Sequence, residues 1–179
     1  IARATGYFQC DCRGAGTDWQ VDEIRRISQA LLGTVAIIPE PGQMETQFRE
    51  MMRTSMSRGV AEAQLRVWSP QGAQVLFVRQ VSPTVEELTD RRVVINPLTG
   101  GYPTGAWSDE SRDYHVAVRV AAKAIGQEQL AARVMLAVGD DVLAQALVKA
   151  TWSGNSELTA AIDQQVAHYT GQTELAAMI

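Results

Sequence analysis

In residues 6–56, short apolar runs alternate with longer stretches in which apolar residues recur at helical spacing. Short apolar runs at 7–12 and 35–38 predict strands, and the glycine turn Arg13 to Gly16 follows the first. Apolar residues after each strand recur every three or four positions, which predicts two amphipathic helices. Gly33 can end the first helix in the left-handed conformation. Because the connections are short, we expect the strands to pair in parallel. The apolar helical positions are Val21, Ile24, Ile27, Leu31 and Leu32, then Met44, Phe48, Met51, Met52 and Met56.

From Gly59 the pattern changes to alternation between apolar and polar residues, which indicates strands with one buried face. Turn residues at 69–72 and at 139–141 predict two hairpins. Residues 96–112 have no period and are expected to form a long loop. Several short strands with close turns favour an antiparallel immunoglobulin-like β-sandwich. The predicted strands are 61–68, 73–81, 92–95, 114–120, 130–138 and 142–152.

Helical spacing returns near the end of the chain. Leu158, Ile162 and Val166 recur at helical intervals, and Asn155 or Ser156 is expected to cap this helix. A further helical turn is predicted at 173–179. The pattern therefore divides the chain into an α/β part at 1–58, a β-sandwich at 59–153 and a helical segment at 154–179.

Residues 1–58 carry a resemblance to a known family. The turn Cys12-Arg13-Gly14-Ala15-Gly16-Thr17-Asp18, the helix Val21-Asp22-Glu23-Ile24-Arg25-Arg26-Ile27 and the stretch Glu45-Thr46-Gln47-Phe48-Arg49-Glu50-Met51 resemble the last third of a von Willebrand factor type A domain. The resemblance implies a C-terminal β-α-β-α piece of this Rossmann-type fold. The strings Tyr102-Pro103-Thr104-Gly105-Ala106-Trp107 and Glu110-Ser111-Arg112-Asp113-Tyr114-His115 resemble the β-rich segment that follows the domain in actinobacterial proteins.

The resemblance also bears on metal binding. Type A domains usually bind a divalent metal through an Asp-x-Ser-x-Ser loop that lies upstream of the part matched here. The nearest string, Asp109 to Asp113, lacks the final serine and sits in a polar stretch. Surface loops are often acidic without binding a cation. We therefore expect no cofactor and no metal site in this chain, and a divalent metal only in the rest of the parent domain.

Composition excludes several classes of partner. The chain is 46% hydrophobic and 20% charged, and its 16 basic residues are scattered and outnumbered by 20 acidic ones, for a net charge of −4. This balance argues against nucleic-acid binding. No apolar run is long enough to span a membrane. Without a signal-peptide pattern or a disulfide framework, we expect a cytoplasmic bacterial protein.

The chain begins directly at Ile1, so we expect a piece of a longer protein that is cut inside a domain. If a neighbouring strand is missing, Tyr7 to Cys12 would present an unpaired edge, which is a candidate for homo-oligomer formation or domain swapping. Cys10 and Cys12 face one side of this strand and are expected to be reduced, buried thiols.

Catalytic chemistry finds little support in the sequence. His115 lies near Ser111 and Asp113, but no nucleophile turn is present, and His168 lies on the terminal helix. Glycines 14 and 16 could cradle a phosphate before the helix, but a turn tightened for packing is the favoured interpretation. The methionine stripe of the second helix is expected to pack in the core, with an adaptable binding groove as the alternative.

We therefore expect a non-enzymatic protein-interaction or adaptor module. Its candidate partner-binding loop contains Tyr102, Pro103, Trp107 and Arg112. The protein partner itself is not named by the sequence. One alternative is a metal-dependent ligand-binding protein or enzyme whose active residues lie upstream. The other is a structural spacer.

Overall fold

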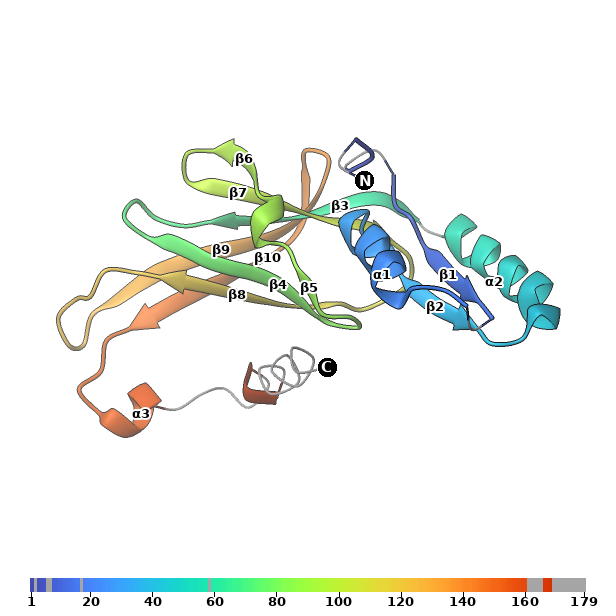
Figure 1. Ribbon diagram of the computed structural model, residues 1–179. Coiled ribbons are helices and arrows are strands. Elements are labelled where there is room, and N and C mark those ends of the chain that lie inside the picture. Colours follow the sequence, from blue (N-terminus) through green and yellow to red (C-terminus); the bar gives the residue numbers. More distant parts are fainter. Residues whose placement is uncertain (2, 6–7, 17, 58, 161–165, 169–179) are drawn as a thin grey trace. The chain divides into compact units, whose positions relative to one another are not determined.

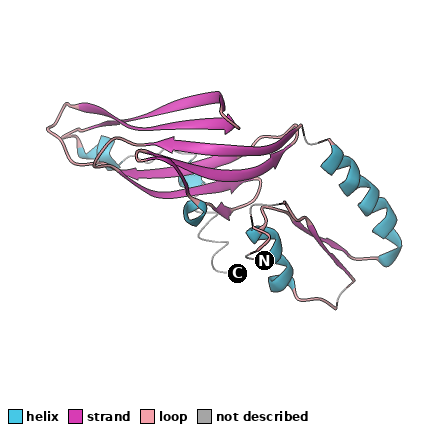
Figure 2. Ribbon diagram, turned by 90° about the horizontal axis from the view of Figure 1, so that it is seen from above, coloured by secondary structure: helices cyan, strands magenta, loops and turns pink. Residues whose placement is uncertain are grey.

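The structure is a computed structural model that describes all residues except 2, 6–7, 17, 58, 161–165 and 169–179. Its contacts define two compact units, which are described separately. The first unit comprises residues 1–63 and 104–110, and the second comprises 64–103 and the described residues from 111 onward. Helices occur mainly in the first unit, whereas strands dominate the second (Figure 2).

The first unit contains the predicted strand, helix, strand, helix order (Figure 1). β1 and β2 pair in parallel, as the short connections predicted, from Cys12 opposite Val35 to Ala15 opposite Ile38. The first strand was placed too early, because it runs through the expected turn residues and ends before Gly16, whose φ is +74°. The elements are β1 (Cys12–Ala15), α1 (Val21–Ala30), β2 (Val35–Ile38), the 3-10 turn η1 (Pro41–Gln43) and α2 (Met44–Met56).

Helix α1 packs on this small sheet and ends in a Schellman motif. The Gly33 amide donates to the Ser28 carbonyl at 2.8 Å, and the Leu32 amide donates to the Gln29 carbonyl at 3.4 Å. The left-handed residue is Leu32, with φ 54°, and not Gly33 as expected. Gly33 is needed for a different reason, because a Cβ there would lie 1.8 Å from the Cys10 carbonyl oxygen.

Two sheets make up the second unit, except that the start of β3 and the end of β7 belong to the first unit, and the pairs β9–β10, β3–β9, β6–β7, β4–β5 and β4–β8 are antiparallel. One has the order β10-β9-β3-β7-β6, and the other has the order β5-β4-β8. The predicted hairpin at 139–141 is confirmed, since Asp141 lies opposite Val138 in the β9–β10 pair. The strands are β3 (Val60–Trp68), β4 (Gln74–Ser82), β5 (Glu86–Glu87), β6 (Val93–Asn96), β7 (Thr99–Trp107), β8 (Asp113–Arg119), β9 (Glu128–Val138) and β10 (Asp141–Thr151).

The predicted hairpin between β3 and β4 is wrong. The turn at 69–72 forms, with the Ala73 amide donating to the Pro70 carbonyl at 3.0 Å, but it carries the chain from one sheet to the other. β3 pairs with β9, and β4 pairs with β8. Alternation within each strand predicts one buried face but does not say which strand lies alongside.

The apolar core of the second unit draws on both sheets. The buried side chains include Leu65, Val67, Val78, Val81, Leu88, Ala132 and Ala137. The 3-10 turn Thr89–Arg91 helps to close this core, because the Thr89 hydroxyl accepts the Val78 amide at 3.0 Å. β10 contributes no buried residue.

Residues 96–112 are not one long loop, as was expected, because Thr99–Trp107 forms β7. Its glycines permit close neighbours: a Cβ on Gly101 would lie 2.7 Å from the Gln64 side chain. Gly105 has φ +78°. Three glycines and a proline disguise this strand in the sequence, because such residues are depleted from strand interiors.

The strands are followed by α3 (Ser156–Ala160). The Asn155 side-chain oxygen accepts the Glu157 amide at 2.9 Å, which confirms Asn155 as the cap. The predicted helical turn at 173–179 lies outside the described residues. In the part of the chain that the structure describes, no helix is both long and apolar enough to cross a membrane.

Candidate interaction surface on helix α2

The methionine-rich face of α2 is exposed, although it was expected to pack in the core. Helix α2 contains no buried residue, and the Phe48 side chain is 58% exposed. Positions four residues apart lie on one side of a helix, so the exposed side chains form a continuous apolar stripe. We call this set the α2 stripe: Met44, Phe48, Met52 and Met56.

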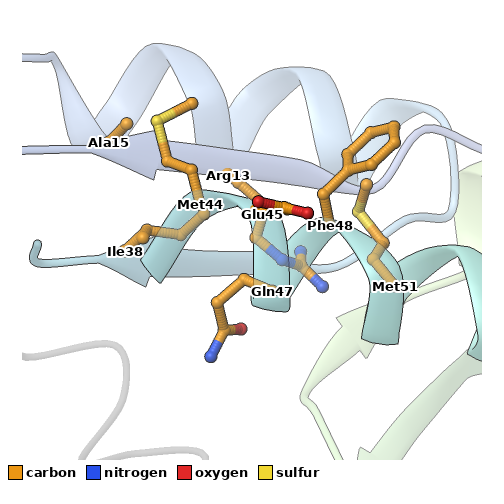
Figure 3. A pocket seen from close by; sticks show the side chains of 8 residues that line it. All are labelled: Arg13, Ala15, Ile38, Met44, Glu45, Gln47, Phe48 and Met51. Atoms are coloured by element: carbon orange, nitrogen blue, oxygen red, sulfur yellow. The ribbon is translucent and has the colours of Figure 1, made fainter. Parts of the chain in front are cut away.

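A hollow of about 360 Å³ lies between the start of α2 and the β1–β2 sheet (Figure 3). Met44, Phe48 and Met51 of the helix line it together with Ala15 and Ile38 of the strands, and in the view Met44 lies nearest to these two strand residues. The polar lining residues are Arg13, Glu45 and Gln47. The hollow therefore extends the α2 stripe inward as a mainly apolar surface.

The charged residues at this hollow already have intramolecular partners. The Arg13 Nη1 atom donates to the Cys12 carbonyl at 2.8 Å and to the Thr34 hydroxyl at 3.3 Å. Glu45 forms an exposed ion pair with Arg49 at 2.6 Å, one helical turn away. Arg13 is therefore held by acceptors of its own unit, whereas the exposed Glu45–Arg49 pair is weak and leaves both charges accessible to solvent.

The residues of the predicted partner-binding loop differ in their exposure to solvent. Tyr102 is 1% exposed in the second unit, and burial raises the pKa of its hydroxyl, an effect that nearby Arg92 partly offsets. A residue so deeply buried cannot contact a partner in this conformation. Pro103, Trp107 and Arg112 are half-buried. Binding through these three residues stays a prediction.

Trp107 also has a structural role. Its indole nitrogen donates to the Thr104 hydroxyl at 3.0 Å, and that hydroxyl donates to the Ala63 carbonyl at 2.8 Å. Thr104 is buried. The half-buried ring is thus tied to the strand pair through a polar group that water does not reach.

The two cysteines lie together without a disulfide. Their sulfurs are 3.8 Å apart and only half-buried, so the expectation of fully buried thiols is corrected. Burial raises the pKa of the Cys12 thiol, and the neighbouring Cys10 and Asp11 add to the shift. Cys12 is therefore protonated and poorly nucleophilic at neutral pH.

The glycine turn before α1 holds a tryptophan. A Cβ on Gly14 would lie 2.2 Å from the Trp19 ring, and the Trp19 indole nitrogen donates to the Gly16 carbonyl at 2.9 Å. Helix α1 begins only at Val21. This geometry supports the packing interpretation of the glycines over a phosphate cradle.

The acidic stretch 109–113 and the histidines do not assemble a cluster. Among the described residues, no three histidine, cysteine or carboxylate side chains come close enough to hold a metal ion together. His115 lies in β8 opposite Arg79 of β4. The Glu110 carboxylate accepts the Ser108 amide at 3.2 Å.

No protein-family model and no curated protein matches this chain. A solved structure, described as von Willebrand factor type A from Catenulispora acidiphila, does match, with 48% sequence identity and a TM-score of 0.93. The chain is similar to a von Willebrand factor type A protein. The match covers 98% of this chain. It therefore includes both residues 1–58 and the later β-rich strings, so one relative is similar to both parts. This chain spans 42% of that relative's length.

Proposed function

We propose that this chain is the C-terminal part of a von Willebrand factor type A domain together with the segment that follows it, and that it acts as a non-enzymatic protein-interaction module. Similarity to one such protein over nearly the whole chain supports the family. The observation that carries the function is the exposed α2 stripe.

Physical chemistry supports a binding role for the stripe. Aligned exposed apolar side chains are unfavourable in water and commonly mark interaction surfaces. Methionine side chains are flexible and polarisable, so they adapt to differently shaped partners. An apolar helical face with a hollow beside it fits a partner helix or an apolar groove of another protein.

Comparative affinity capture tests this role. The chain, its F48E variant and a T46E control are used as baits in an extract of the organism that makes the protein. Thr46 lies on the other side of α2, so the control introduces the same charge away from the stripe. F48E should reduce recovery of at least one partner about tenfold, as loss of an apolar anchor does, whereas T46E should retain it. Identical recovery by all three, with folding intact by circular dichroism, would refute the proposal.

The metal-dependent alternative predicts a different result. We propose that this chain binds no divalent metal and that any such site lies elsewhere in the parent protein. Calorimetric titration with Mg²⁺ or Mn²⁺ should give no binding heat with this chain. Binding by the full-length protein alone would favour the alternative of an upstream metal-dependent site, and binding by this chain would overturn our interpretation.

The remaining half-buried loop residues offer a second surface. The W107A variant tests this surface, because the Trp107 side chain is partly accessible. The same side chain also donates a hydrogen bond to Thr104. If neither W107A nor F48E changes the recovered proteins, the spacer alternative is favoured. We further propose that the two sheets form an immunoglobulin-like sandwich, as the strand pattern suggests, and that the protein is cytoplasmic.

A further inference from the structure

β10 is the outermost strand of the five-stranded sheet. One side pairs with β9 along its length, and no described strand pairs with the other side (Figure 1). Such a side presents unpaired N–H and C=O groups that can accept another strand. Leu143 and Leu147 are 60% and 53% exposed, and Val142 and Val148 are exposed as well. β10 therefore offers both backbone hydrogen bonds and apolar contacts.

The sequence of this strand is symmetric. From Asp141 to Lys149 it reads D-V-L-A-Q-A-L-V-K, a palindrome around Gln145 except for the charges at its ends. When a strand pairs antiparallel with its own copy across a twofold axis, residues equally distant from the centre lie opposite each other. With Gln145 at the axis, Val142 would face Val148, Leu143 would face Leu147 and Ala144 would face Ala146.

The end residues complete this match with opposite charges. Asp141 of one copy would lie opposite Lys149 of the other, and symmetry makes this pair occur twice. Opposite charges across a strand pair are favourable, whereas like charges there are destabilising. Within its own chain Lys149 contacts Glu128 at 2.9 Å, but both side chains are more than half exposed. That surface ion pair is weak enough not to compete strongly.

We propose that β10 pairs antiparallel with β10 of a second copy of this chain, with Gln145 on the twofold axis, and joins two five-stranded sheets into one. A register shift by two residues would place the leucines opposite glutamine and a charged residue and would lose both ion pairs. Pairing with β9 skips Leu143, so Ala144, Gln145 and Ala146 are the central positions that lie in the uninterrupted run of both copies. This surface is distinct from the α2 stripe and has a different partner.

Charge reversal tests the register. Sedimentation velocity of the chain should show a dimer that dissociates on dilution. D141K and K149D should each weaken dimerisation about tenfold, because each converts two attractive pairs into repulsive ones. The double variant D141K/K149D should restore it, since the pairs are only exchanged. E128Q is the matched control, because it removes the ion pair within the chain and should leave the dimer unchanged.

A cross-link tests the axis independently of charge. Under oxidised glutathione, Q145C should form a disulfide between copies, identified by mass spectrometry, because residues at the axis directly face each other. A144C should form far less, since position 144 faces 146 of the other copy. A chain that stays monomeric at every concentration, or a dimer that keeps its affinity in both single charge reversals, would overturn the proposal. Dimerisation of the double variant D141K/K149D would show that β10 pairs with its own copy. It would thereby exclude pairing with another protein as the main role of β10.

Discussion

Only glycine fits at position 33, because the neighbouring backbone leaves no room for a Cβ atom. The Cys10 carbonyl oxygen occupies the space that a Cβ would need, and backbone cannot yield as a flexible side chain can. G33A should lower the free energy of unfolding by more than about 3 kcal/mol, the upper end of overpacking effects. Urea unfolding followed by circular dichroism measures this. G59A is the control, because nothing lies within 4 Å of a Cβ there, and equal stability of the two variants would contradict the argument.

Glu86 and Glu87 are neighbours whose pKa values shift in opposite directions. Burial raises the pKa of Glu86, and Arg91 and Arg112 only partly offset this. Burial also disfavours the charged form of Glu87, but hydrogen bonds from Thr89 and Arg79 outweigh it and lower the pKa. The Arg79 Nε atom donates to Glu87 at 3.0 Å. The direction depends on hydrogen bonding to the carboxylate and not on burial alone.

These shifts predict opposite pH dependences. The pKa of Glu87 is lower in the folded chain than in the unfolded chain. Glu87 therefore stabilises the fold fully above its pKa in the unfolded chain, and this stabilisation is lost as pH falls through its pKa in the folded chain. E87Q should therefore lower stability at pH 7 by up to about 1 kcal/mol, limited by the exposure of this side chain, and the loss should fade in acid.

For Glu86 the sign reverses, because a raised pKa makes its contribution disappear as pH rises through the folded value. E86Q should therefore be at least as stable as the wild type at pH 7 and should converge with it in acid. Urea unfolding at both pH values checks the two variants together. A parallel pH response of E86Q and E87Q would show that the environments of the two carboxylates are wrongly assigned.

At the scale of elements, β7 is fastened by the Thr104 hydroxyl. T104V keeps the shape but leaves the Ala63 carbonyl and the Trp107 indole without the partner they have now. Unsatisfied buried polar groups should lower the free energy of unfolding by about 1–3 kcal/mol. T104S keeps the hydroxyl and should lose less. Thermal unfolding of the two variants gives the comparison, and a T104V as stable as T104S would argue against the hydrogen-bond role.

Element types were more predictable than element pairings. β2, α2 and β8 lie close to their predicted positions because their periods are uninterrupted. β7 was missed because Gly100, Gly101 and Pro103 obscure its alternation. The partners of β3 and β4 were missed because each strand buries one face whichever strand lies alongside it.

At the scale of the molecule, helix α2 differs from strands β3 and β9 in how many side chains are buried. α2 has no buried residue, whereas β3 and β9 contribute several side chains to the core of the second unit. Local opening needs less free energy where few buried contacts are lost. Amides of α2 should therefore exchange with deuterium at least tenfold faster than those of β9, measured by mass spectrometry, and equal protection would contradict this.

The sequence by itself determined the two changes of period, the parallel β1–β2 pair, the β9–β10 hairpin and a helix cap at Asn155 or Ser156, because these depend on neighbours in the chain. Tertiary structure alone decided that the α2 stripe is exposed, that Tyr102 is buried and that β7 lies inside a sheet. Exposure depends on which distant segments come to cover a side chain, and local spacing carries no information about them. The palindrome of β10 can be read in the sequence, but it indicates self-pairing only because the structure places that strand at the edge of a sheet.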